Sequence, residues 1–115
     1  MDTKAVLDHH LAGFLAGDAD EVLKGYSDES VIMTPDGVLK GRQAIHTLFS
    51  EFFSGLFKPG TYEIALDTTL IEGDVAYIVW HASCASADIP IATDTFVVRD
   101  GKIAVQTLAA KIDSN

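Results

Sequence analysis

The feature that most constrains the fold is a change of sequence pattern near residue 60. Before this point, apolar residues recur every three or four positions, which indicates amphipathic helices. After it, long runs rich in β-branched and aromatic residues are separated by turn residues such as Gly73-Asp74 and Asp100-Gly101. Helices followed by strands in this way indicate an α+β domain whose helices cover one face of a sheet. The predicted antiparallel strands are 62–72, 75–84, 91–99 and 103–112.

The first half of the chain predicts three helices and one short strand. The first helix carries apolar residues from Val6 to Leu15 and ends at Gly17-Asp18. A second, shorter helix follows directly and includes Tyr26. The third runs from Gly41-Arg42 to Lys58 and has a wide apolar face. The short strand, residues 30–34, lies between the second and third helices and is stopped by a Pro-Asp-Gly turn.

Length and composition narrow the classes of function. A chain of 115 residues is expected to form a single domain over residues 1–115. Hydrophobic residues make up 48% of the chain and charged residues 22%, which suggests apolar surface beyond a core, in a cavity or a subunit interface. The net charge of −9 disfavours nucleic acid and anionic membrane surfaces as partners. The single cysteine, Cys84, and the lack of a membrane-spanning run favour a cytoplasmic protein.

Asp94 is the only charged residue in the strand pattern 91–98. Side chains alternate along a strand, so Asp94 shares its face with Ala92, Phe96 and Val98, and this face should point at a core or a dry pocket. An ionised carboxylate there is costly unless it is paired, hydrogen-bonded or protonated. Asp94 is therefore a candidate site residue. The alternative is a strand at the edge of the sheet, with Asp94 facing water between two threonines.

Three short motifs occur in a characteristic order along the chain: Gly17-Asp18-Ala19-Asp20, Tyr26-Ser27-Asp28-Glu29-Ser30 and Arg99-Asp100-Gly101-Lys102. With the order of elements, they resemble the NTF2-like superfamily, in its SnoaL-like and ketosteroid-isomerase-like branch, over essentially the whole chain. The resemblance implies a cystatin-like cone, in which three N-terminal helices pack on a strongly curved antiparallel sheet around a hydrophobic pocket. The superfamily includes isomerases, cyclases, dehydratases, epoxide hydrolases and binding modules, so the fold alone does not select a function.

The resemblance to the ketosteroid isomerases also implies roles for individual residues. Asp94 matches their protonated oxyanion-hole aspartic acid, and His10 matches the tyrosine of that hole. Thr34, which precedes Pro35, falls where these enzymes have their general-base aspartate. A neutral hydroxyl is no base near pH 7, so steroid isomerisation by that mechanism would need another base, such as Asp36 reaching in from the turn.

His81 is a second candidate base. If the loop after its strand has an even number of residues, His81 and Asp94 share a face of the sheet. The carboxylate would then orient the imidazole and stabilise its charged form, while His10 would act as a polarising donor. Residues 85–90 have no tight-turn signature that fixes the loop length, and His81 could equally be an ordinary core or interface histidine.

The other residues expected in the pocket are mainly aromatic. Gln106 is included from the family match, although a two-residue turn at Asp100-Gly101 would point Thr107 inward instead. No cofactor and no metal are expected, because the histidines and Asp94 lack the short spacing of usual metal motifs. The predicted ligand-binding residues are Phe14, Met33, Thr34, Phe49, Phe53, Phe96 and Gln106.

These observations predict a SnoaL-like protein whose pocket holds a small apolar molecule. Acid/base chemistry of isomerase, cyclase or dehydratase type on an apolar carbonyl compound would use Asp94, His81 and His10. The alternative is a non-catalytic domain for small-molecule binding or protein interaction. A homodimer through the outer sheet face is also expected, because an inward Asp94 and His81 would leave an apolar patch outside. That patch would consist of Ile78, Trp80, Ile91 and Val97.

Overall fold

Capping residues set the ends of the first two helices. In the computed structural model, which describes residues 1–114, helix α1 spans Thr3–Ala16 and helix α2 spans Ala19–Leu23. Asp2 and Asp18 each accept a hydrogen bond from a backbone amide in the first turn of the helix that follows. Gly17 ends α1 with a φ of 65°, a left-handed conformation that favours glycine. The predicted end of the first helix is therefore confirmed.

Six strands form one sheet in the order β2-β1-β6-β5-β4-β3. Neighbouring strands are antiparallel, except that β1 and β6 run parallel. The hairpin turn before β6 is the predicted Asp100-Gly101, with both residues at positive φ as a tight two-residue turn requires. The strands are β1 (Tyr26–Thr34), β2 (Gly37–Lys40), β3 (Tyr62–Glu72), β4 (Val75–Cys84), β5 (Ala87–Arg99) and β6 (Lys102–Ser114).

Some element boundaries differ from the predicted ones. Tyr26 begins β1 and does not belong to the second helix. Helix α3 (Arg42–Ser54) ends before Lys58, because the chain turns at Gly55. Strand β5 begins before residue 91, because the turn that precedes it is only the two residues Ala85-Ser86.

Within two strands, β5 and β6, a bulge changes whether the odd-numbered or the even-numbered side chains point inward. Between β4 and β5, Trp80 pairs with Ala92 while Ala82 pairs with Ile89, so His81 alone lies opposite two residues of β5. Buried positions of β5 consequently change from odd numbers near the turn to even numbers further along. A similar shift occurs between β5 and β6, where Ala104 is the extra residue. Because bulges bend the strands that carry them, these shifts help to curve the sheet.

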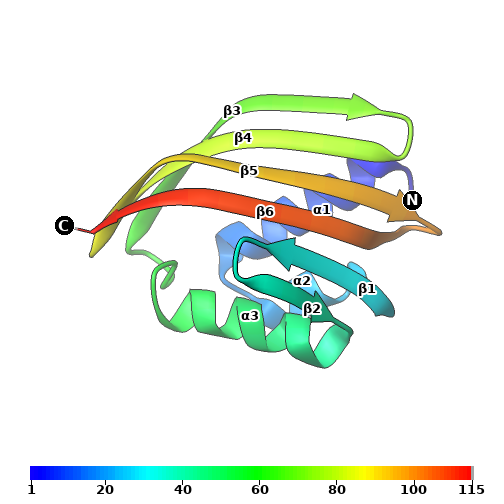
Figure 1. Cartoon of the computed structure of the whole chain (residues 1–115), viewed down its shortest axis with the longest axis horizontal. Helices are drawn as coiled ribbons and strands as arrows, with labels where there is room; N and C mark the ends of the chain where they lie inside the picture. The colour runs from blue at the N-terminus through cyan, green and yellow to red at the C-terminus, as the bar shows by residue number, and fades with distance from the viewer. Residues whose placement is uncertain (115) are drawn as a thin grey trace.

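The concave face of the curved sheet packs over the helices (Figure 1). Leu7 of α1, Ile45 of α3 and Phe96 of β5 are almost completely buried in the shared core. The predicted α+β arrangement of three helices and a curved, mostly antiparallel sheet is confirmed. Within residues 1–114, no helix combines the length and apolar composition needed to cross a membrane.

Candidate functional site

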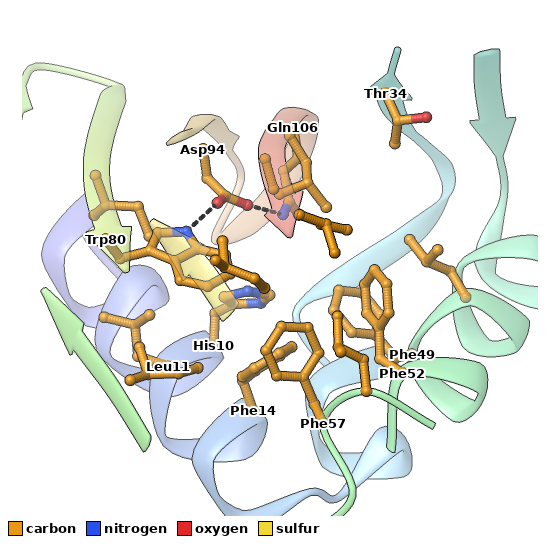
Figure 2. A pocket seen from close by; sticks show the side chains of 18 of the residues that line it. His10, Leu11, Phe14, Thr34, Phe49, Phe52, Phe57, Trp80, Asp94 and Gln106 are labelled. Atoms are coloured by element: carbon orange, nitrogen blue, oxygen red, sulfur yellow. Dashed lines mark hydrogen bonds between the residues drawn. The ribbon is translucent and has the colours of Figure 1, made fainter. Parts of the chain in front are cut away.

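A cavity of about 380 Å³ lies between the helices and the concave sheet face. Its walls are mostly aliphatic and aromatic side chains (Figure 2). Its titratable lining residues are His10, Asp36 and Asp94. Such a site has the size and apolar character of a small-molecule pocket. The residues that line it are His10, Leu11, Phe14, Thr34, Pro35, Asp36, Leu48, Phe49, Phe52, Leu56, Phe57, Ile64, Leu66, Ile78, Trp80, Ile89, Asp94, Gln106, Leu108, Ala110 and Ile112.

Both carboxylate oxygens of Asp94 accept hydrogen bonds from neighbouring strands. The Trp80 indole of β4 donates from Nε1 to Oδ1 at 2.8 Å, and the Gln106 amide of β6 donates from Nε2 to Oδ2 at 2.9 Å (Figure 2). Asp94 is only 5% exposed, so these two donors replace the water that would otherwise solvate it. The alternative of Asp94 facing water at a sheet edge is wrong, since β5 lies between β4 and β6.

The hydrogen-bond chain continues from Gln106 to the first helix. Tyr26 of β1 donates its hydroxyl hydrogen to Oε1 of Gln106. The same hydroxyl lies 3.4 Å from Nδ1 of His10, on α1. His10 is buried, and its ring packs edge-on against those of Tyr26, Phe49 and Phe96. The chain therefore joins Trp80, Asp94, Gln106, Tyr26 and His10 across four strands and one helix.

Burial shifts the protonation equilibria of the three titratable members of this chain. It raises the pKa of Asp94 from 3.8 to about 6, against the opposing effect of the Trp80 and Gln106 hydrogen bonds. Burial, aided by the nearby charge of His9, lowers the pKa of His10 from 6.5 to about 4, so its imidazole is neutral near pH 7. Burial and the charge of Asp94 raise the pKa of Tyr26 well above its usual 10. Tyr26 therefore keeps its proton.

His81 does not share a face with Asp94, and that prediction is wrong. Its side chain lies on the outer face of β4, is exposed, and contacts Oδ2 of Asp67 through Nδ1 at 2.8 Å. The loop does have an even number of residues, as the prediction required. However, the bulge opposite His81 adds one residue to β5, so beyond it the even-numbered residues of β5, including Asp94, lie on the same face as the even-numbered residues of β4. His81 is therefore not near His10 and Asp94, and within residues 1–114 no three side chains of His, Cys, Asp or Glu gather in a way that could hold a metal ion.

The predicted ligand-binding residues divide between the cavity, the core and the surface. Phe14, Phe49 and Gln106 line the cavity, as does Thr34, which Figure 2 shows apart from the Asp94 group. Two aromatic residues, Phe53 and Phe96, are buried in the core outside the lining. Met33 is 41% exposed and does not line the cavity.

The position that matches the general base of the ketosteroid isomerases is occupied by a structural hydroxyl. Thr34 Oγ1 accepts a hydrogen bond from the Asp36 amide at 3.1 Å and so stabilises the turn between β1 and β2. The Asp36 side chain is exposed where it borders the cavity. Gln106 faces inward, as the family match implied. Without a bulge, Thr107 would share the inward face with Asp94, but the extra residue Ala104 shifts the alternation by one and turns Gln106 inward instead.

The sequence did not predict two members of the hydrogen-bond chain, Trp80 and Tyr26. Trp80 was expected on the outer face with Ile78, yet both point inward and line the cavity. The sequence pattern predicts a helix at Tyr26, but Tyr26 begins β1 and is the most buried tyrosine. A signal for the first error was present, because Pro90 in a central strand indicates a bulge.

Comparison with known proteins adds a family and a fold. Residues 7–106 match the family model of the SnoaL-like domain. No sequence among the curated proteins matches this chain. An NTF2-like protein of unknown function from Mesorhizobium loti is similar in structure, with a TM-score of 0.79, 24% identity, and coverage of 95% of this chain and 90% of that one.

Two further similar structures carry provisional enzyme assignments. One, from Kribbella flavida, is provisionally assigned as a ketosteroid isomerase, with a TM-score of 0.78, 14% identity, and coverage of 95% of this chain and 77% of that one. The other, from Sinorhizobium meliloti, is provisionally assigned as a polyketide cyclase, with a TM-score of 0.77, 16% identity, and coverage of 90% and 93%. At these identities the likeness shows the NTF2-like fold. From the match over residues 7–106, the chain belongs to the SnoaL-like domain family.

Proposed function

We propose that this SnoaL-like protein binds a small, uncharged, apolar carbonyl compound in the cavity and exchanges a proton with it at Asp94. The observation that carries the proposal is a carboxyl group at the wall of an apolar cavity, held by Trp80 and Gln106. Its pKa of about 6 leaves both the acid and the carboxylate populated near neutral pH. A group of this kind is suited to general acid or base catalysis.

The charge of the lining supports an uncharged ligand. Among the described lining residues there is no Lys or Arg, and two of them, Asp36 and Asp94, are carboxylic acids. The whole chain carries a net charge of −9. A phosphate or carboxylate ligand would therefore be repelled and would find no cationic partner, whereas a ketone needs only apolar contacts and one or two hydrogen bonds.

Deuterium exchange into a ketone tests the catalytic proposal. The bicyclic ketone 2-tetralone has acidic hydrogens next to its carbonyl, and their replacement in D₂O is followed by proton NMR. We expect the protein to accelerate this exchange, and Asp94→Asn to abolish the acceleration. Asp28→Asn makes the same chemical change at an exposed position of β1 and should leave the accelerated exchange intact.

The alternative function is a non-catalytic small-molecule-binding domain. It is favoured by the position of Thr34, whose hydroxyl stabilises a turn where the ketosteroid isomerases have their base. If 2-tetralone binds saturably without accelerated exchange, and if Asp94→Asn leaves this binding unchanged, the result would support this alternative and contradict catalysis. Absence of binding would contradict both.

A further inference from the structure

The hydrogen-bond chain from Asp94 to His10 has a direction. Trp80 Nε1 is only a donor, so Oδ1 of Asp94 is always an acceptor. The Gln106 amide donates to Oδ2, and Tyr26 donates to the carbonyl of Gln106. The Tyr26 oxygen is then free to accept from Nδ1 of His10. With Asp94 ionised, every hydrogen bond in the chain points toward the carboxylate.

The outer ring nitrogen of His10 faces the cavity. The described residues supply no hydrogen-bond partner for Nε2, and none of their fully buried polar side-chain atoms lacks a partner. Nε2 therefore remains accessible from the cavity that His10 lines. A neutral imidazole has one N–H and one lone pair, so a proton on Nδ1 leaves Nε2 as a hydrogen-bond acceptor for a ligand.

Protonation of Asp94 would reverse the chain. In this scheme the new proton sits on Oδ2, because its partner Gln106 can turn from donor to acceptor, whereas the Trp80 indole at Oδ1 can only donate. It is then donated to the Gln106 carbonyl, which requires the side-chain amide to rotate by half a turn into an arrangement of nearly the same shape. The Gln106 NH₂ now donates to Tyr26, and the Tyr26 hydroxyl donates to Nδ1 of His10.

The proton balance of this reversal is simple. One proton is taken up, at Asp94. His10 takes up one proton from cavity water at Nε2 and releases its Nδ1 proton to water, so it still carries a single proton and the net uptake of the whole chain is the one proton on Asp94. Tyr26 keeps its hydroxyl hydrogen and only rotates it.

We propose that Gln106 and Tyr26 form a relay that sets the proton position on His10, so that the cavity offers an acceptor when Asp94 is ionised and a donor when Asp94 is protonated. This inference rests on the proposed function, which it refines. A ligand with a hydroxyl or enol group fits the first state, and a ligand with a carbonyl group fits the second. A keto compound and its enol would therefore be bound by opposite states of the same relay.

Two other titratable groups lie near the relay. His9, on the same helix, acts on His10, and Asp36, in the turn between β1 and β2, borders the same cavity with an exposed side chain. Phe49 of α3, which packs against the His10 ring, and Trp80 of β4, which donates to Asp94, carry no charge. The neutral state of His10 and the protonated state of Tyr26 near pH 7 are both required by the relay.

Nitrogen NMR of the histidine rings tests the relay in the unliganded protein. We expect the His10 proton on Nδ1 at pH 8 and on Nε2 at pH 5. In Asp94→Asn the amide of residue 94 donates to the Gln106 carbonyl at every pH, so the His10 proton should stay on Nε2. Tyr26→Phe removes the link and should abolish the change with pH, whereas Tyr62→Phe, whose hydroxyl donates to the Phe14 carbonyl outside the chain, should behave as wild type.

Ligand binding provides a second test of the relay, with two probes of similar shape. On lowering the pH from 8 to 5, the affinity for 2-tetralone, an acceptor only, should rise roughly three- to tenfold relative to that for 2-naphthol, as expected for one hydrogen bond. Asp94→Asn should hold the low-pH ratio at both pH values. A proton position on His10 that is the same at pH 5 and pH 8 in the wild type overturns the relay. If neither probe binds, the proposed function fails, while the NMR measurement still decides the relay.

Discussion

Replacing Asp94 by Asn should remove a pH-dependent loss of stability. The pKa of Asp94 is about 6 in the folded protein, against 3.8 ordinarily, so the folded state binds this proton more tightly than the unfolded chain. The resulting stabilisation is fully present below pH 3.8 and is lost as the pH rises through 6. The two values differ by an amount that corresponds to about 3 kcal/mol, of which roughly 1.4 kcal/mol is lost between pH 5 and pH 8.

Urea unfolding of the wild type and Asp94→Asn between pH 5 and pH 8 measures this effect, in a range above the sequence pI of 4.6. We expect the variant to gain roughly 1.4 kcal/mol relative to the wild type over this range, because Asn carries no charge to bury. Asp28→Asn, at an exposed position, should run parallel to the wild type. A constant difference between wild type and Asp94→Asn would refute the reasoning that burial controls this carboxyl group.

Three further outcomes are expected. Because the pKa of His10 is lowered from 6.5 to about 4, the stability of the wild type decreases as the pH falls from 6.5 toward 4. His10→Gln lacks this loss, so its free energy of unfolding should rise by about 2 kcal/mol relative to that of the wild type between pH 7 and pH 5. Parallel curves for the two proteins would contradict this. Phe49→Ala should cost about 3–5 kcal/mol in urea unfolding, because Phe49 is 3% exposed, whereas a loss below 1 kcal/mol would contradict its place in the core. We also propose a homodimer through the outer sheet face, where Tyr77, Leu70 and Ile91 are exposed. Tyr77→Glu should shift sedimentation toward the monomer. A wild type that is monomeric at micromolar concentration would exclude the dimer.

The opposite pH responses of Asp94 and His10 have a consequence for the wild type. As the pH falls from 7 to 5, Asp94 adds stability while His10 loses it, so the two effects largely cancel. A flat stability profile of the wild type is therefore compatible with two strongly perturbed groups. Only the single variants separate them.

The overall architecture could be predicted because it follows from local patterns. Helical spacing, an aspartate before each of the first two helices, Gly17 after α1 and the Asp100-Gly101 turn each act over a few residues. Asp94 could be found in the same way, as a lone charge on an apolar strand face.

The partners of Asp94 could not be predicted, because they depend on the register between strands. One extra residue opposite His81 turns that histidine outward and Trp80 inward, and another at Ala104 turns Gln106 inward. A bulge shifts every later side chain to the other face, so one undetected bulge changes a whole set of assignments. Pro90 was a local sign of the first of these two shifts.

The indole N–H of Trp80 offers the most direct test of the claim that the cavity around Asp94 holds the ligand. Trp80 is the only tryptophan in the chain, and its N–H donates to Asp94 at the cavity wall, so its single nitrogen-proton NMR signal reports on this site. On titration with 2-tetralone, we expect a saturable shift of this signal that is altered in Asp94→Asn. Binding of 2-tetralone that leaves the indole signal unchanged would place the ligand elsewhere and contradict a ligand site at Asp94.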